Sequence, residues 1–366
     1  MKVLLVGNYK GDKQWSMNRF CNMLFRGLQA EGVEVEVIRP AVVLGGRNKW
    51  MGYADKFVLF WFTLRRAVKT RPGWVVHIID QGNGIYAGGI GPMGPMRCAV
   101  TCHDLLAIRA ASGEFPEHRT PWTGRLFQSL ILSGLQKARC MACVSGATQR
   151  DAERLIGDAE IIPNGLEDFW RPLDPEEAWK QIDQAGVGAC AAGYLLHVGG
   201  SQWYKGRPGA VRVFINVRKQ TRLAVKLLMV GPALDGTLRA ELKAAGLDGD
   251  VVVLTAVSDE LLRALYAMAR LLIFPSLEEG FGWPILEAQA CGCPVVATAK
   301  EPMRETGGKA AIFADEGEWA NAIADALKMD DAQRAAVVAA GRENARCYTV
   351  KRMAREYIDF YRRHFQ

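Results

Sequence analysis

The sequence lacks any apolar run near the roughly 18 residues that a helix needs to cross a bilayer, which argues against a membrane-spanning protein. Its start, MKVLLVGNYKG, also lacks the organisation of a secretory signal peptide and predicts a strand followed by a glycine turn. Neither low-complexity tracts nor short repeats occur. With 366 residues, of which 49% are hydrophobic, we expect a packed cytoplasmic protein of two domains.

The nine cysteines lack the spacing of a metal site or of a disulfide framework. Cys140 and Cys143 form a C-x-x-C pair, but no second pair follows at the spacing of a zinc site. The pair also falls within the predicted strand ARCMACVS. We interpret these residues as buried thiols in a reducing compartment.

Acidic residues are scarce in the first 150 residues, where 20 lysines and arginines face 9 aspartates and glutamates. Residues 151–366 have the reverse balance, 26 against 30, so the net charge of +7 combines +11 in the first part with −4 in the second. The positive charge of the first 150 residues favours an anionic partner, such as a membrane surface, a phosphorylated acceptor or nucleic acid.

Short apolar runs alternate with helical patterns along the chain, which predicts an α/β protein with parallel, doubly wound sheets. The alternation pauses around LEDFWRPLDPEEAW and then restarts, so we expect Rossmann-like domains at residues 1–170 and 188–345. In a last helix, within 346–366, apolar residues recur at helical spacing and must pack on another part of the protein. The predicted strands are KVLLVG, VEVEVIRP, WVVHIID, RCAVTCHD, ARCMACVS and AEIIPNG, then YLLHVGG, RLAVKLLMVG, DVVVLTAV and RLLIFPS.

Rossmann-like halves are also typical of nicotinamide dehydrogenases, but the fingerprint of that class is missing. The turn after the first strand, VGNYKGDKQ, has no G-x-G-x-x-G pattern, and the glycines of GNGIYAGG have the wrong spacing. The sequence therefore argues against a dehydrogenase.

One segment, KWMGYADKFVLFWFTLRRAVK at residues 49–69, combines aromatic and basic residues. Its apolar centre, Phe57 to Leu64, is too short for a membrane span but could enter a membrane interface, with lysines and arginines at anionic headgroups. The alternative, which we favour, is a helix that covers the first sheet.

Two glutamates, Glu279 and Glu287, stand eight positions apart in EEGFGWPILEAQACGCPVV, residues 278–296. The flanking apolar runs predict strand, loop, helix, turn and strand, with Pro284 at the first helical position. Glu279 then falls in the loop and Glu287 in the first helical turn. Ligands bind beyond the carboxyl ends of parallel strands, and phosphates favour helix N-termini, so this stretch predicts a ligand site.

This stretch resembles the E-x7-E signature of the family 4 retaining glycosyltransferases, enzymes of the GT-B fold that use nucleotide-sugar donors. The order and spacing match that signature for the first acid, the Gly-Phe-Gly, the proline, the second acid and the Gly-x-Pro turn. Three further segments resemble the family: ACVSGATQRDAERL, IIPNGLEDF, and LLHVGG followed by YKG. The resemblance therefore runs from about residue 75 to the end. It implies two facing Rossmann-like domains, the first binding the acceptor and the second the nucleotide-sugar, with the C-terminal helix crossing back to the first.

The resemblance also implies roles for residues of the second domain. Glu287 would hold the ribose of the nucleotide, and Glu279 would hold donor-sugar hydroxyls near the reacting carbon. Backbone amides around Gly280, Phe281 and Gly282 would approach the pyrophosphate, because glycine allows a close approach.

Two cations are expected at the phosphates. Lys205, in VGGSQWYKGRPG, matches the family's lysine, but Gly200 stands where the family has an arginine. We expect Arg207 to supply the second positive charge.

In the first domain, His103 and Asp104 of VTCHDLLAIR resemble the family's His-Asp pair in the cleft, where His103 would hydrogen-bond the donor sugar. Asp80, Gln81 and Asn83 follow another strand, in HIIDQGNGIYAGG. They could bind acceptor hydroxyls, or serve only the conformation of the turn.

Asp248 and Asp250 form an Asp-x-Asp, the metal signature of a different glycosyltransferase fold, but GLDGDVVVL predicts a helix-to-strand turn. We therefore expect neither a metal nor another cofactor, with the helix dipole and Lys205 in the place of a cation.

The sequence thus predicts a retaining, metal-independent hexosyltransferase-type enzyme that moves a sugar from a UDP- or GDP-sugar to a hydroxyl of a glycan, glycolipid or small molecule. The basic first domain would allow peripheral contact with the inner face of an anionic membrane, and nucleic acid is not an expected partner. Two alternatives share these residues: a nucleotide-sugar epimerase of the same fold, which needs no acceptor, and a non-catalytic nucleotide-sugar-binding subunit.

Overall fold

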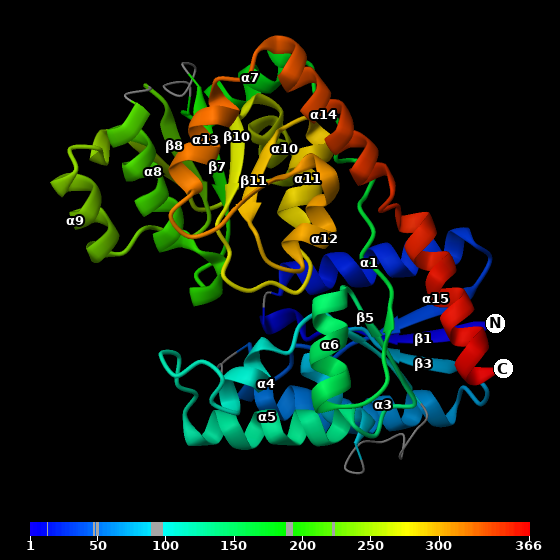
Figure 1. The fold of residues 1–366 in the computed structure, drawn as a ribbon. Coiled ribbons are helices and arrows are strands. Elements are labelled where there is room, and N and C mark those ends of the chain that lie inside the picture. Colours follow the sequence, from blue (N-terminus) through cyan, green and yellow to red (C-terminus); the bar gives the residue numbers. More distant parts are fainter. Residues whose placement is uncertain (13, 47, 49–50, 89–97, 188–192, 222–223) are drawn as a thin grey trace. The chain divides into compact units, whose positions relative to one another are not determined.

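The computed structural model describes residues 1–12, 14–46, 48, 51–88, 98–187, 193–221 and 224–366 (Figure 1). The chain divides into two compact units: unit 1 comprises Met1–Gly165 and Val350–Gln366, and unit 2 comprises Leu166–Thr349. The expected domain boundary at residue 188 and the first two residues of the basic segment, 49–50, lie outside the described residues.

Residues 166–187, which the sequence suggested as the end of the first domain and a link, belong to unit 2. The prolines and acids that suggested a link begin a helix, α7 (Pro175–Gln184), because Asp174 caps it and Pro175 needs no intrahelical partner at its first position. Helix α7 packs against α10 (Asp259–Met268), and the ring of Trp170 contacts Tyr266 with the centroids 5.9 Å apart.

Unit 1 is built on a six-stranded parallel sheet in the order β2-β1-β3-β4-β5-β6. These are the six strands predicted for the first half of the chain. Strands β1 and β4 are apolar along most of their length, as expected when helices cover both faces of a parallel sheet. The strands are β1 (Lys2–Val6), β2 (Glu34–Ile38), β3 (Val75–Ile78), β4 (Cys98–Cys102), β5 (Cys140–Cys143) and β6 (Glu160–Ile161).

Helices cover the two faces of this sheet. The described helices are α1 (Trp15–Ala30), α2 (Gly52–Ala54), α3 (Phe60–Lys69), α4 (Leu106–Ala111), α5 (Trp122–Leu135), α6 (Gly146–Leu155) and α15 (Val350–Phe365). Turns of 3₁₀ helix span Lys10–Asp12 and Gln81–Ala87, and a π-helical turn spans Asp55–Leu59.

The last helix, α15, packs against α1 on one face of the sheet. The two helices approach closely at Gly27, where an added Cβ would lie 2.9 Å from the Cβ of Ala354. The C-terminal helix therefore crosses back to the N-terminal unit, as predicted. Its buried apolar and aromatic side chains include Met353, Tyr357, Ile358 and Tyr361.

A buried polar chain fixes α15 to the sheet. His77 of β3 contacts the Tyr361 hydroxyl through Nδ1 at 2.6 Å and Thr101 Oγ1 through Nε2 at 2.8 Å. Thr101 Oγ1 lies 2.7 Å from the Tyr357 hydroxyl. Burial lowers the pKa of His77 to about 3, so the imidazole is neutral.

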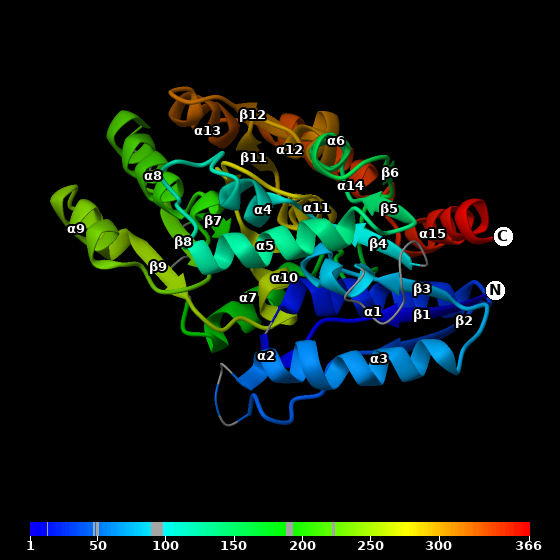
Figure 2. The ribbon, with the colours of Figure 1, turned by 90° about the horizontal axis from the view of Figure 1, so that it is seen from below.

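Helices α3 and α5 cover the opposite face (Figure 2). Side chains alternate along a strand, so Val76 and Val100 point away from α15 while their neighbours His77 and Thr101 point toward it. The core on the far face joins these valines to side chains of α3, of the Gln81–Ala87 turn and of α5, namely Phe60, Leu64, Tyr86, Ile131 and Leu135. The expectation that the basic segment 49–69 forms a helix over the first sheet is confirmed for its described residues.

Unit 2 repeats the plan with a six-stranded parallel sheet in the order β12-β11-β10-β7-β8-β9. Its strands are β7 (Tyr194–Val198), β8 (Lys226–Val230), β9 (Val251–Leu254), β10 (Leu271–Phe274), β11 (Val295–Thr298) and β12 (Ile312–Ala314). Besides α7 and α10, its helices are α8 (Arg207–Thr221), α9 (Gly236–Ala244), α11 (Trp283–Cys291), α12 (Met303–Gly307), α13 (Trp319–Leu327) and α14 (Asp331–Arg346), with 3₁₀ turns at Trp203–Lys205, Asp248–Asp250 and Gly308–Ala310.

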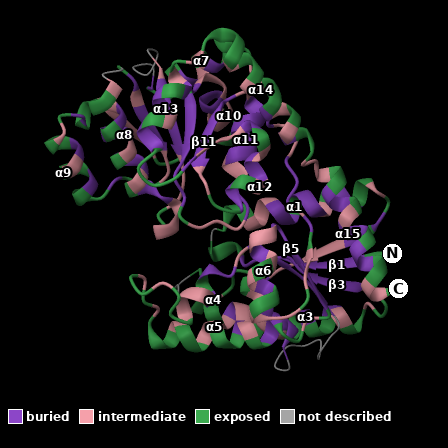
Figure 3. Cartoon of the chain, in the orientation of Figure 1, coloured by how far each residue is buried: buried purple, intermediate pink, exposed green. Residues whose placement is uncertain are grey.

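Within each unit the strands and the inner sides of the helices are buried (Figure 3). In the described part of the chain, no helix has both the length and the apolar character that a membrane crossing would need. The loops that follow the carboxyl ends of the strands carry the polar residues singled out from the sequence.

Candidate active site

Lys205 and Glu279 meet at the carboxyl edge of the unit 2 sheet. Lys205 ends the turn after β7, and Glu279 lies in the loop between β10 and α11. The Lys205 Nζ lies 2.9 Å from Glu279 Oε1 and 2.8 Å from Oε2, and Ser276 donates its hydroxyl to Oε1 at 2.9 Å. Because the Glu279 side chain is only 5% exposed, this ion pair is poorly screened by water.

Glu287 lies deeper than the sequence suggested. Helix α11 begins at Trp283, so Pro284 is its second residue and Glu287 its fifth, beyond the first turn that we expected. Glu287 is 4% exposed, and the Tyr266 hydroxyl donates to its Oε2 at 3.0 Å. Burial, followed by the nearby Glu287 charge, raises the pKa of Tyr266 well above its usual value, so this tyrosine stays a proton donor.

The loop before α11 is held in a fixed conformation. Gly282 caps the helix with φ of +98°, a left-handed conformation that glycine adopts without strain. Phe281 is buried between Trp283 and Tyr348, and its carbonyl accepts the hydroxyl proton of Thr306. Gly280, Phe281 and Gly282 therefore present backbone at the N-terminus of a nine-residue helix.

Arg207, the first residue of α8, joins two loops. Its guanidinium donates to the carbonyl of Gly199 at 3.1 Å and to the carbonyl of Pro232. The close approach requires a glycine at 231, because a Cβ there would lie 2.1 Å from the Gly199 carbonyl oxygen and 2.7 Å from Arg207. Arg207 is 6% exposed, and the described residues give it no carboxylate partner, so its buried charge lacks a counterion there.

The loops after β7 and β10 also touch. Leu277 donates its backbone N–H to the Tyr204 carbonyl at 2.8 Å. Gly206 has φ of +68°, and a Cβ there would lie 2.0 Å from the Pro275 carbonyl oxygen. The contact between these two loops therefore requires glycine at position 206, and it fixes the neighbouring Lys205.

Sequence reasoning missed His197, a fully buried residue of β7 just before this loop. Its Nδ1 lies 3.2 Å from the Ile273 carbonyl oxygen, and its Nε2 has no hydrogen-bond partner among the described residues. Burial, together with Arg207 and Lys205, lowers the pKa of His197 to about 4, so the ring is neutral. The available signal was a histidine inside the otherwise apolar run YLLHV.

In unit 1, the predicted acceptor residues cluster with a residue that the sequence reasoning did not single out, Asn8. Asn8 Nδ2 donates to Asp80 Oδ2, and Asn83 Nδ2 donates to Asn8 Oδ1 at 3.1 Å. Asp80 also accepts the Gly82 N–H at 2.8 Å, which is the conformational role that we had left open. Gln81 accepts the His103 backbone N–H through Oε1 at 2.8 Å.

His103 is held from several sides after β4. Its Nε2 lies 3.0 Å from the Ile79 carbonyl oxygen, and Phe20 packs edge-on with the ring centroids 4.6 Å apart. Thr148 donates its hydroxyl to the His103 carbonyl at 3.3 Å. Burial lowers the pKa of His103, against the opposing effect of Asp80. Asp104 accepts the Leu106 N–H at 3.1 Å and thereby starts α4.

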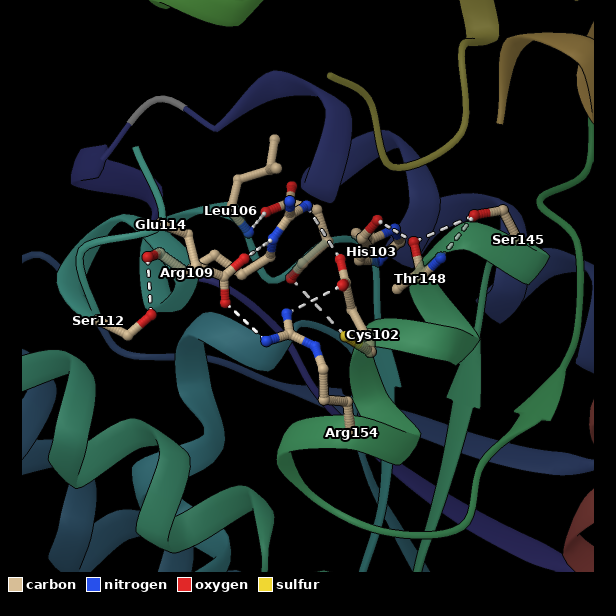
Figure 4. A network of polar contacts seen from close by, with 11 residues as sticks. Cys102, His103, Leu106, Arg109, Ser112, Glu114, Ser145, Thr148 and Arg154 are labelled. Atoms are coloured by element: carbon tan, nitrogen blue, oxygen red, sulfur yellow. Dashed lines mark hydrogen bonds and ion pairs between the residues drawn. The ribbon is translucent and has the colours of Figure 1, made fainter. Parts of the chain in front are cut away.

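Charged side chains bind the segment after His103 to α6 (Figure 4). Glu114 lies 2.8 Å from Arg109 and 2.7 Å from Arg154, and Asp151 lies 3.1 and 3.2 Å from the same arginines. Burial opposes ionisation of Glu114, but hydrogen bonds from Arg154 and Arg109 outweigh it and lower the pKa of the carboxyl. Ser145 caps α6 by accepting the Thr148 N–H at 3.2 Å. These contacts support the backbone that carries His103.

The other candidate motifs have structural roles. Asp248 and Asp250 lie in a turn, where Asp250 pairs with Arg218 at 2.7 Å, and Cys140 and Cys143 are buried in β5, as predicted. Among the described residues, no group of three or more histidines, cysteines and carboxylates has the arrangement of a metal site.

The fold is shared with solved glycosyltransferases. Sucrose-phosphate synthase from Thermosynechococcus elongatus superposes with a TM-score of 0.73 at 20% identity, covering 100% of this chain and 99% of that one. WaaG, a glycosyltransferase involved in lipopolysaccharide biosynthesis, superposes with a TM-score of 0.70 at 16% identity, covering 98% and 99%. Together with the two parallel sheets, these likenesses confirm a two-domain α/β GT-B fold.

Sequence comparison defines the family. Residues 17–168 match the family described as Glycosyltransferase Family 4, and residues 192–329 match that described as Glycosyl transferases group 1. O-antigen chain mannosyltransferase B of Escherichia coli is 31% identical over 274 residues, which cover 73% of this chain and 70% of that protein. D-inositol 3-phosphate glycosyltransferase of Xylanimonas cellulosilytica is 26% identical over 279 residues, covering 71% of this chain and 65% of that protein. The chain belongs to family 4 of the glycosyltransferases.

Proposed function

We propose that this glycosyltransferase moves a sugar from a UDP- or GDP-sugar to a hydroxyl group of a glycan, glycolipid or small molecule, with retention of anomeric configuration and without a metal. The contact of Lys205 with Glu279 supports this most directly, because a cation suited to phosphates lies beside a carboxylate suited to sugar hydroxyls. A structure of the similar fold from Anabaena, HepE, at 20% identity, holds UDP and glucose.

The phosphates bind where positive charge converges. The N-terminus of α11 offers backbone N–H groups around Gly280 and Gly282, and Lys205 adds a point charge. Arg207 contributes the second cation in place of the arginine missing at Gly200, since a diphosphate would supply the counterion that the described residues do not give it. These groups stabilise the leaving nucleotide without a metal ion.

The two glutamates bind different parts of the donor. Glu287, oriented by Tyr266, accepts hydrogen bonds from the ribose hydroxyls. Glu279, held by Lys205 and Ser276, accepts hydrogen bonds from the donor sugar and stabilises the positive charge that develops at its anomeric carbon.

Residues of unit 1 bind the sugars. His103 is neutral, and a neutral imidazole that donates through Nε2 to the Ile79 carbonyl accepts a sugar hydroxyl at its other nitrogen. Asp104 and the cluster of Asp80, Gln81 and Asn83 contact the acceptor.

Mannose is the first donor sugar to test, because the 31% identical relative is named as a mannosyltransferase. The experiment incubates the protein with a panel of UDP- and GDP-linked hexoses, GDP-mannose included, with and without acceptors, in buffer containing a chelator. Transfer to an acceptor with retained configuration, seen by NMR, supports the proposal. An isomerised sugar without acceptor would indicate an epimerase, and donor binding without turnover would indicate a binding subunit.

We also infer that the protein works in the cytoplasm and contacts the inner face of an anionic membrane through unit 1. The net charge of +11 over residues 1–150 supports this location. Fractionation of cells at low and high salt tests it, because a peripheral protein leaves the membrane fraction when salt screens the contact.

A further inference from the structure

The outer sides of α3 and α5 expose large apolar side chains. On α5 they recur every fourth residue, so they form a stripe along one side of the helix. Before and within α3, three more residues form a second exposed set. The six are Val58 at 53%, Leu59 at 41% and Phe62 at 63% exposure, and Trp122 at 76%, Leu126 at 57% and Leu130 at 38%.

These two sets belong to one surface. Both helices bury their inner sides in the same core on one face of the unit 1 sheet, so their outer sides face away from the sheet together. The π-helical turn that leads into α3 also contacts α5, since Phe57 and Phe127 have ring centroids 5.5 Å apart. Both helices run along the same side of the sheet in Figures 1 and 2. We call the exposed side the α3–α5 surface.

The segments that form the α3–α5 surface carry exposed cations and no exposed carboxylate of their own, and at their edges Lys56 pairs with Asp12 and Arg71 with Glu36. Residues 51–71 and 119–139 contain one acidic residue, Asp55. Asp55 is 1% exposed, and it accepts the N–H groups of residues 43–45 at 2.9 to 3.0 Å and the Tyr9 hydroxyl at 2.8 Å. Hydrogen bonds from these amides and from Tyr9 outweigh desolvation and lower the pKa of Asp55 to about 2, so its charge is used inside the protein.

The exposed cations stand next to the apolar side chains. Arg65, Arg66 and Lys69 follow Phe62 on α3, and Arg125 precedes Leu126 on α5. The Arg65 guanidinium lies 5.3 Å from the Trp61 ring centroid. Apolar and aromatic side chains flanked by lysine and arginine, without acidic residues, match the chemistry of a lipid headgroup region, where cations meet phosphates and aromatic rings enter the interface.

We propose that the α3–α5 surface docks on an anionic lipid bilayer. The inference rests on the peripheral location proposed for unit 1 and assigns it to a defined set of side chains. Phe62, Trp122 and Leu126 enter the interface, and the neighbouring arginines and lysine bind headgroup phosphates. Because both helices also close the core of unit 1, binding needs no rearrangement of the fold.

Vesicle co-sedimentation with the full chain tests the contribution of the arginines and the lysine to docking. We expect binding to vesicles of phosphatidylglycerol and phosphatidylcholine, and much weaker binding to pure phosphatidylcholine. The variant Arg65→Glu/Arg66→Glu/Lys69→Glu should bind anionic vesicles at least about 100-fold more weakly, since each cation near such a surface contributes roughly fivefold. The control Lys243→Glu/Lys300→Glu/Lys328→Glu makes the same charge change on exposed residues of unit 2 and should bind nearly as the wild type.

A second variant tests the contribution of the apolar side chains to docking. Phe62→Ser/Leu126→Ser should weaken vesicle binding at least about tenfold, and the binding that remains should be fully salt-sensitive. The control Val42→Ser/Ile161→Ser removes two apolar side chains of unit 1 that are 48% and 42% exposed elsewhere. Far-UV circular dichroism and nucleotide binding establish that each variant is folded.

Equal binding of the unit 1 and unit 2 charge variants would overturn the proposal, as would equal affinity for anionic and neutral vesicles. Self-association in the absence of lipid that the Phe62→Ser/Leu126→Ser variant abolishes would show that a second copy, and not a bilayer, covers the surface. Vesicle binding does not depend on catalysis. Loss of transfer to a soluble acceptor with intact vesicle binding would therefore contradict the proposed function and leave the docking surface standing.

Discussion

Lys205 Nζ contacts both carboxylate oxygens of Glu279, at 2.9 and 2.8 Å, across 74 positions of sequence. The lysine side chain is 26% exposed and the glutamate side chain 5%, so Lys205 is the side of the pair that a ligand can reach. A donor phosphate would share the ammonium and leave the carboxylate free to bind the sugar. In the proposed function the pair would therefore link the charge of the leaving group to the position of Glu279.

The first prediction concerns Glu279→Gln. The neutral amide keeps the size of the side chain but loses the charge that we propose stabilises the anomeric centre, so kcat should fall about 10 to 1,000-fold. Free nucleotide should bind almost as before in calorimetry. Glu278→Gln, one residue earlier, is the matched control and should retain most of the activity. A loss of nucleotide affinity equal to the loss of kcat would contradict the role assigned to Glu279.

A second prediction separates Glu287 from Glu279. Glu287→Ala should raise the donor KM more than it lowers kcat, because the ribose contact proposed for Glu287 is the same in the ground and transition states. Tyr266→Phe removes the hydroxyl that donates to Glu287 and should weaken nucleotide binding about 3 to 10-fold, which corresponds to one typical hydrogen bond of about 0.5–1.5 kcal/mol.

Tyr194→Phe is the control for the tyrosine. Tyr194 is also fully buried in unit 2, and its hydroxyl donates to the Leu265 carbonyl at 2.7 Å. Both variants should lose similar stability, but only Tyr266→Phe should lose nucleotide affinity. Equal affinities in the two variants would show that Tyr266 has a purely structural role.

The third prediction compares two glycines with the same backbone conformation. Gly206 and Gly246 both have φ of +68°, but an added Cβ would lie 2.0 Å from the Pro275 carbonyl oxygen at Gly206 and would meet nothing within 4 Å at Gly246. The cost of the left-handed conformation is common to both alanine variants. Gly206→Ala should therefore lower the free energy of unfolding by at least about 2 kcal/mol more than Gly246→Ala, and should also lose donor affinity. Chemical denaturation and calorimetry measure the two effects.

The fourth prediction concerns pH. His77 is buried and neutral, with its pKa lowered to about 3, whereas an unfolded histidine titrates near pH 6.5. Its stabilising contribution is complete above about pH 6.5 and falls by up to about 1.4 kcal/mol per pH unit as the pH drops toward 3, because only the unfolded chain binds the proton. In His77→Gln the free energy of unfolding should depend less steeply on pH below 6.5. Between pH 7 and 8 the slopes of variant and wild type should agree; a difference confined to that range would contradict the assignment.

The sequence predicts most of the fold because a parallel sheet buries both faces, and buried strands appear as continuous apolar runs. Strand β12 (Ile312–Ala314) escaped this reasoning because it has three residues, two of them only partly buried. Helix α7 was taken for a link, since a proline and acids suit both a linker and the first turn of a capped helix.

The site was predicted in part for the same physical reasons. Glycines, a proline and glutamates mark a helix start, but the position of Glu287 beyond the first turn depends on the helix beginning at Trp283. The partners of the predicted residues could not be inferred: Ser276, Tyr266 and Asn8 are ordinary polar side chains until the fold brings them to Glu279, Glu287 and Asp80. Such pairings follow from tertiary packing and leave no local pattern in the chain.

Because α15 completes the packing of unit 1, the order of synthesis affects how this unit folds. A ribosome releases the six strands of that unit first, then all of Leu166–Thr349, and only afterwards the helix that supplies Tyr357 and Tyr361 to Thr101 and His77. The first sheet thus leaves the exit tunnel with one face covered by α1 but not yet by α15, and with His77 lacking the Tyr361 hydroxyl. The final packing of unit 1 waits for residues 350–366, so the nascent N-terminal half is the stage at which chaperones would meet this protein.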